Sequence, residues 1–98
     1  YLHMAAVFAC NFANHMYTLS AYLLEKQGLP FDAMLPLIDE AARKVHTLCP
    51  AEAQTGPAVR KDANVMNKHL EMLAEEPELK EIYKIISKSI CHSGQNEV

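Results

Sequence analysis

Residues 1–24 contain no Asp, Glu, Lys or Arg. The few polar side chains in this largely apolar stretch are therefore the ones that could take part in chemistry there. Asn11, His15 and Thr18 recur there at spacings that place them on one face of a helix. A buried polar group without a hydrogen-bond partner costs about 1–3 kcal/mol. Partners could come from the chain itself, from a two-fold interface, or from a ligand and water in a cleft.

A second cluster of such residue types extends from Thr55 to Asp62. Gly56 permits close approach of a ligand to the backbone, Thr55 can bind a ligand oxygen, and Arg60 can hold a carboxylate or phosphate. The alternative is a structural turn in which Arg60 pairs with Asp62 or with a neighbouring helix. Both interpretations fit the residue types.

His69 lies on the apolar face of a predicted helix, where a histidine more often packs than binds a ligand. None of the histidines has the spacing of a helical metal-binding motif, and the carboxylates form no obvious acid–base pair, so we expect no metal site. The three cysteines, Cys10, Cys49 and Cys91, are widely separated and lack a C-x-x-C spacing. We expect reduced thiols in the cytoplasm.

The composition is that of an ordinary globular domain, with 98 residues of which 50% are hydrophobic and 21% charged. The net charge of −3 offers no basic surface for nucleic acid or an anionic membrane. The uncharged first segment is long enough to span a bilayer. Its polar residues and the absence of a flanking basic cluster argue against a membrane span, and a signal peptide would need a positive start.

Helical periodicity predicts a first helix from about Leu2 that ends near Gly28 and is apolar on most sides. A helix of this kind is typical of a core larger than four short helices can supply. The helical pattern of apolar residues already begins at Leu2, and Tyr1 is not an initiator methionine. We therefore expect the chain to be part of a longer protein.

The later elements follow from similar signals. We expect a second helix over about 30–48 with Pro36 in its first turns, a loop over 49–57, a third helix capped by Asp62, and a fourth that begins at Pro77. The predicted fold is all-α, a bundle of four to five helices with a long buried first helix. Residues 1–91 form the domain, and residues 92–98 are expected to be a disordered tail.

Three stretches together resemble the family DUF2520, a C-terminal domain of unknown function found behind a Rossmann-like NAD(P)-binding domain. They are H-M-A-A-V-F-A-C-N-F from His3, L-P-L-I from Leu35, and A-Q-T-G-P-A-V-R-K-D from Ala53 followed by His69-Leu70. The likeness covers residues 1–86 in the family's order. It implies a helical domain of the 6-phosphogluconate dehydrogenase C-terminal-like kind, which dimerises and covers the cleft of the nucleotide-binding domain.

The resemblance also implies a set of residues that face this cleft. With His15, which lies one turn beyond Asn11, the candidates are Asn11, His15, Thr55, Gly56, Pro57, Arg60, Asp62 and His69. His3 is a further polar position of the family pattern. Two positions depart from it, since Lys61 replaces a glycine of the loop and Val65 replaces a threonine.

The functional expectation is a C-terminal dimerisation and active-site-covering domain of an NAD(P)-dependent oxidoreductase, acting on an unknown small-molecule substrate. The hydride chemistry would belong to NADP or NAD bound by a Rossmann domain absent from this chain. The chain has no G-x-G-x-x-G, so we expect no tight dinucleotide binding by the chain alone. We expect a homodimer formed through the first helix. The alternative is a structural module that pairs subunits without touching substrate.

Overall fold

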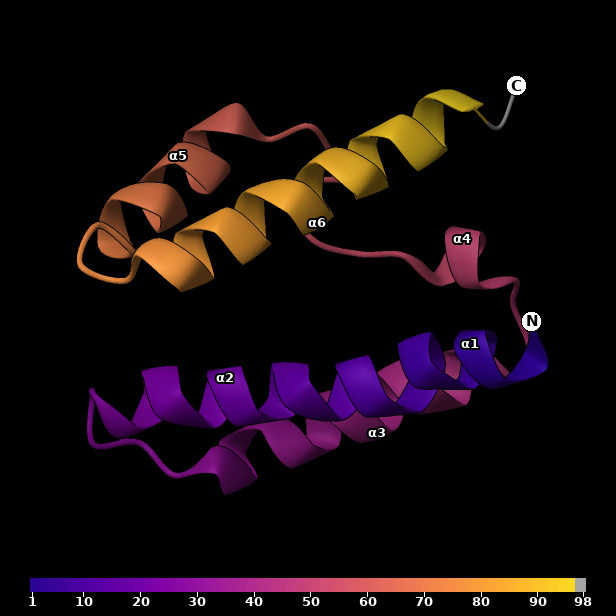
Figure 1. Ribbon diagram of the computed structural model, residues 1–98, viewed down its shortest axis with the longest axis horizontal. Coiled ribbons are helices and arrows are strands. Elements are labelled where there is room, and N and C mark those ends of the chain that lie inside the picture. Colours follow the sequence, from indigo (N-terminus) through magenta and orange to yellow (C-terminus); the bar gives the residue numbers. More distant parts are fainter. Residues whose placement is uncertain (97–98) are drawn as a thin grey trace. The chain divides into compact units, whose positions relative to one another are not determined.

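The computed structural model describes the backbone of residues 1–96 and the side chains of residues 1–92. The chain divides into two compact units, residues 1–40 (unit 1) and residues 41–98 (unit 2), whose positions relative to one another are not determined. Every regular element in the described part of the chain is a helix (Figure 1). The predicted all-α fold class is confirmed.

Unit 1 begins with one long helix that runs without a break from Leu2 to Glu25, as the sequence predicted. It consists of α1 (Leu2–Ala6), the π-helical segment η1 (Val7–Phe12) and α2 (Ala13–Glu25). Periodicity at 3.6 residues per turn gave no sign of the π-helical segment, which is a rare form and is frequent at functional sites. The rings of Phe8 and Phe12 meet edge to face in this segment, with centroids 5.0 Å apart.

The first helix stops where glycine lets the backbone turn back on itself. Gly28 has φ of 69°, a left-handed conformation that costs glycine little. The Leu29 amide donates to the Leu24 carbonyl at 3.0 Å, and the Gly28 amide donates to the Glu25 carbonyl at 3.0 Å. These two bonds form a Schellman motif and satisfy the free carbonyls of the last turn. The predicted stop at Gly28 is confirmed.

The second helical segment starts as the 3-10 helix η2 (Phe31–Met34) and continues as α3 (Leu35–Lys44), which crosses from unit 1 into unit 2. Phe31 packs on Tyr17 of α2, with ring centroids 6.4 Å apart. Pro36 is the second residue of α3, where a missing amide hydrogen costs little. The helix is shorter than the predicted range, since only turns follow Lys44 as far as Thr47.

The predicted loop over residues 49–57 contains a short helix that the sequence analysis missed. Helix α4 (Pro50–Ala53) is a single turn that follows Cys49, and Pro50 occupies its first position. Proline suits that position because its φ is already helical and its missing amide hydrogen has no partner to lose. The turn-forming residues noted for this loop, Thr55 to Pro57, follow α4 in irregular backbone.

Unit 2 is built on α5 (Ala63–Met72) and α6 (Pro77–Asn96), with Pro77 at the predicted start of the last helix. The Asp62 side chain accepts a hydrogen bond from the Val65 amide at 3.2 Å, which confirms the predicted cap of α5. The buried hydrophobic residues of the described chain all belong to this unit and are Ala58, Leu73 and Leu79.

The end of α6 differs from the sequence prediction. The helix continues to Asn96, so the backbone of residues 92–96 is helical where a disordered tail was expected. The remainder of that expected tail, residues 97–98, lies outside the described residues. Apolar positions of α6 recur through Ile90, and the polar residues after it extend the same helix.

The first helix is long but this chain does not bury it, and no residue of α1, η1 or α2 is classed as buried. Large apolar side chains are exposed along its first half, among them Leu2 (87% exposed) and Phe8 (65%). The burial expected from the sequence is therefore not supplied by the chain itself. Within the described residues, no helix is both long enough and apolar enough to cross a membrane.

Candidate functional site

The turn that follows Gly56 brings most of the predicted site residues of unit 2 together. The Ala58 carbonyl accepts from the Lys61 amide at 3.1 Å, and the Pro57 carbonyl accepts from the Asp62 amide at 2.9 Å. This is the bonding pattern of a Schellman motif, in which the next-to-last residue takes the left-handed conformation. Lys61 occupies that position with φ of 55°. The family's glycine at this position therefore has a conformational reason.

Gly56 also requires the freedom of glycine, since its φ is 103°. An added Cβ at Gly56 would meet no atom of the chain within 4 Å. Backbone conformation, rather than contact with another part of this chain, accounts for glycine there. Thr55, immediately before it, is exposed, and Gly56 and Pro57 are half-buried.

Two contacts fix this turn on the helices of unit 2. Ala58 is 4% exposed, and its carbonyl also accepts a hydrogen bond from the Cys91 thiol of α6 at 3.2 Å. The Asp62 carboxylate is bonded to the start of α5. The structural alternative of an Arg60–Asp62 pair is not formed in the described part of the chain. Arg60 is exposed at the surface of the turn.

His69 lies seven residues beyond Asp62 on α5, about 10 Å along the helix axis. Its Nδ1 is 2.7 Å from the hydroxyl oxygen of Tyr83 on α6, and the two rings meet at 81° with centroids 5.7 Å apart. Burial raises the pKa of the Tyr83 hydroxyl above its ordinary value of 10.0. His69 is thus a packed histidine whose Nδ1 has a polar partner.

Tyr83 was not among the residues that the sequence predicted for the site. The apolar repeat of α6 includes Tyr83 as one more inward position, and its hydroxyl has a partner only because α5 and α6 pack together. The nearest signal in the sequence was a histidine and a tyrosine on the apolar faces of consecutive helices. Such a pair is a weak signal without the helix packing.

The remaining candidates, Asn11 and His15, belong to unit 1 and are exposed on the first helix. Asn11 lies within the π-helical segment, and His15 follows in α2. Thr18, the third member of this polar row, donates to the Asn14 carbonyl of its own helix at 3.4 Å. The predicted site residues therefore form two groups, one in each unit, and six of the eight belong to unit 2.

The side chains of residues 1–92 include no group of three His, Cys, Asp or Glu residues placed to hold a metal ion. The three cysteines are free thiols, and Cys91 is half-buried where it contacts the turn. The chemistry that this arrangement offers is hydrogen bonding and cation–anion pairing from a fixed turn, together with a histidine–tyrosine pair on the neighbouring helices.

Replacing Lys61 by glycine is expected to stabilise unit 2. The left-handed conformation costs a residue with a Cβ about 1–2 kcal/mol, and glycine avoids this cost. The greater freedom of glycine in the unfolded chain offsets about 0.5–1 kcal/mol of that stabilisation. Lys61→Gly should therefore raise the free energy of unfolding by about 0.5–1 kcal/mol, measured by urea denaturation. Lys61→Ala, which keeps the Cβ, is the control. Equal stability of the glycine and alanine variants would contradict the argument.

The Tyr83 hydroxyl is expected to make the chain less stable in alkali. Because its folded-state pKa is raised, the unfolded state releases this proton first, and the free energy of unfolding falls as the pH rises above 10.0. Tyr83→Phe lacks this proton but loses the bond to His69. Its stability deficit relative to the unmodified chain should shrink between about pH 8 and pH 11. A constant deficit in urea titrations across that range would refute the assignment.

The solved structure of a protein from Bacteroides fragilis, described as a "putative NADP oxidoreductase", is similar to this chain. The two are 62% identical, and the TM-score is 0.91 over 93% of this chain. The chain spans only 35% of the length of that protein. No curated protein matches. The profile of the family described as "Domain of unknown function (DUF2520)" matches residues 1–90, as the three sequence stretches indicated, and the chain belongs to this family.

Proposed function

We propose that residues 1–91 are the C-terminal helical dimerisation and active-site-covering domain of a cytoplasmic NADP-dependent oxidoreductase. The observation that carries this proposal is the close match, at 62% identity, to about a third of a protein described as a "putative NADP oxidoreductase". The other two thirds leave room for a nucleotide-binding domain. NADP, or NAD, bound there would supply the hydride chemistry, and this domain would help to enclose a small-molecule substrate.

The turn over Pro57–Asp62 is the part proposed to face the cleft. Arg60 is exposed on a turn whose backbone is held by its own hydrogen bonds and by the Cys91 thiol. A guanidinium held on a fixed backbone can bind a carboxylate or phosphate with two parallel hydrogen bonds. Thr55 is exposed nearby in sequence and adds a hydroxyl.

The first helix is the part proposed to form the homodimer. Tyr1, Leu2, Met4, Phe8 and Phe12 are each at least half exposed. Large apolar side chains exposed along one helix are typical of an interface, because soluble monomers rarely expose contiguous apolar patches of more than a few hundred Å². Asn11 and His15 lie on the same helix, either in the cleft or within the dimer interface.

The alternative is a structural module that pairs subunits and touches no substrate. The observation that favours it is the exposed apolar side chains of the first helix, which need a partner surface whether or not the turn touches substrate. The polar residues of the first helix would then satisfy one another across the two-fold interface, and the Arg60 turn would only connect helices.

Arg60→Ala in the full-length oxidoreductase separates the two proposals. A charge-assisted hydrogen bond contributes about 1.5–3 kcal/mol, so loss of Arg60 should reduce NADPH binding or turnover about tenfold or more while the dimer stays intact. Lys68→Ala removes an exposed charge from α5 and serves as the matched control. Unchanged binding and turnover with a weakened dimer would favour the structural module. NADPH should not bind to the 98-residue chain alone at micromolar concentration.

The chain itself is expected to sediment as a dimer at micromolar concentration. Phe8→Glu places a charge in the apolar surface of the first helix and should shift the chain toward monomer. Met72→Glu is the matched control, because Met72 is similarly exposed but lies on α5 in unit 2. Analytical ultracentrifugation measures both variants. A monomeric unmodified chain, or dissociation by the Met72 variant alone, would contradict dimerisation through the first helix.

A further inference from the structure

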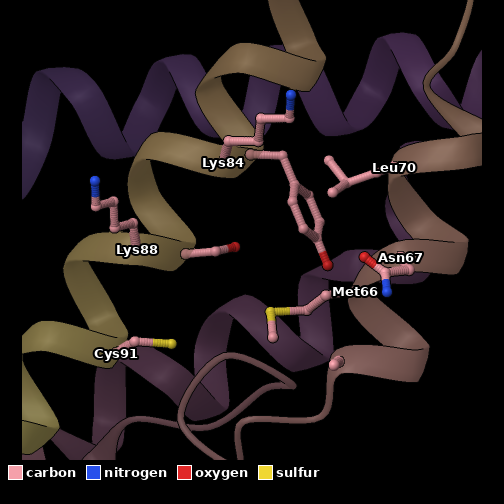
Figure 2. Close-up of a pocket in the computed structure, with 9 residues that line it drawn as sticks. Met66, Asn67, Leu70, Lys84, Lys88 and Cys91 are labelled. Atoms are coloured by element: carbon pink, nitrogen blue, oxygen red, sulfur yellow. The ribbon is translucent and has the colours of Figure 1, made fainter.

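A pocket with a volume of about 270 Å³ opens between α5 and α6 in unit 2 (Figure 2). From α5 it is lined by Ala63, Met66, Asn67 and Leu70, and from α6 by Tyr83, Lys84, Ser87, Lys88 and Cys91. This volume is just below the ~300–1,000 Å³ of pockets that hold drug-sized ligands. It therefore suits a small molecule better than a macromolecular segment.

The walls of the pocket are largely apolar, with polar groups at particular points. Met66 and Leu70 border it from α5, and the stems of Lys84 and Lys88 border it from α6, with their nitrogen atoms at the outer ends of the side chains (Figure 2). Lysine stems commonly cover apolar surface while the ammonium group stays in water. The Ser87 hydroxyl and the Asn67 amide add hydrogen-bonding groups.

The charged residues that line the pocket are both lysines. Lys84 and Lys88 line it, and none of the described lining residues is Asp or Glu. Two carboxylates belong to neighbouring positions: Asp62 accepts from the Val65 amide at the start of α5, and Glu81 Oε1 lies 3.8 Å from Lys84 Nζ in a pair that is exposed on both sides. An exposed pair of this kind contributes little and exchanges readily. The two ammonium groups therefore favour an anion at the rim.

The Tyr83 hydroxyl provides a directed group on the pocket wall. Tyr83 lines the pocket, whereas His69 does not, and the Tyr83 hydroxyl oxygen lies 2.7 Å from His69 Nδ1. With Nδ1 protonated, His69 donates to the phenol oxygen and leaves the phenol's own proton for an acceptor in the pocket. A phenol with the ordinary pKa of 10.0 is protonated at neutral pH, and burial raises the pKa of Tyr83 further, so the donor is present under ordinary conditions.

We propose that this pocket binds a small organic carboxylate with an apolar body. The body packs on Met66 and Leu70, the carboxylate lies toward Lys84 and Lys88, and Tyr83 donates a hydrogen bond. His69 is a positioning residue that acts through Tyr83. The proposal does not depend on the oxidoreductase assignment, because it needs only α5 and α6 of this chain and no nicotinamide.

Binding can be tested on the ¹⁵N-labelled chain with three probes of equal chain length, namely octanoate, octanol and octylammonium. Octanoate should shift the amide resonances of α5 and α6 at saturation and bind about fivefold more tightly than octanol, with octylammonium weakest. Shifts confined to residues 1–25 would show that octanoate binds only the exposed first helix and would overturn the proposal. Equal affinity for the three probes would overturn it as well.

Replacing the two lysines tests whether their charge holds the carboxylate. Replacing both Lys84 and Lys88 by glutamine should reduce octanoate affinity about fivefold, to the level of octanol, without changing octanol affinity. Both lysines are exposed, so the fold should be retained. Lys68→Gln is the matched control, since Lys68 is exposed on α5 but does not line the pocket. A loss of octanoate affinity as large in the control would refute the rim assignment.

Tyr83→Phe and His69→Gln test the positioning role. Tyr83→Phe should weaken octanoate binding and leave the α5 and α6 shift pattern in place, while His69→Gln, which keeps a donor toward Tyr83, should bind octanoate nearly as well as the unmodified chain. Full octanoate affinity in Tyr83→Phe would remove Tyr83 from the site. If Tyr83→Phe or His69→Gln is too unstable to measure, the lysine variants still test the pocket.

Discussion

The closure of the backbone over Pro57–Asp62 is the constraint on which unit 2 depends. The chain reverses there directly before α5, and carbonyls at a buried reversal must find donors. The Pro57 carbonyl receives the Asp62 amide, and the Ala58 carbonyl receives both the Lys61 amide and the Cys91 thiol of the last helix. The same closure places the Asp62 carboxylate over the first turn of α5. One six-residue turn thus links the start of α5 to the far end of α6.

Closing this turn requires a left-handed residue, and in this chain that residue is Lys61. A side chain at that position is strained, and the strain persists because the surrounding hydrogen bonds over-determine the backbone. In a turn held in this way the backbone of Arg60 has little conformational freedom. Rigidity is the property that a cleft-facing guanidinium needs, since binding then orders only the side chain.

The two units differ in how their apolar residues are used. Unit 2 contains the buried residues Ala58, Leu73 and Leu79, whereas no residue of the first helix is buried. Aromatic contacts such as Tyr17 with Phe31 hold unit 1 together, but most of its apolar surface faces outward. A helix with this much exposed apolar surface is stabilised by a second surface, and the proposed dimer would provide it.

Local chemistry made much of the fold predictable from sequence. The end of the first helix at Gly28, the cap at Asp62 and the start at Pro77 each depend on residues within one turn of the boundary, and all three are confirmed. The helical period placed His69 on the apolar face of its helix, where the structure packs it against Tyr83. What the period could not show were departures from it, namely the π-helical segment, helix α4 and the continuation of α6 to Asn96.

The site is different, because the Tyr83–His69 bond joins residues 14 apart and the Cys91–Ala58 bond joins residues 33 apart. The sequence alone determined which residues were available and how each helix would begin and end. Only the packing of α5 against α6 decided which of them meet, because a hydrogen bond between distant residues exists only where the tertiary fold brings donor and acceptor within reach.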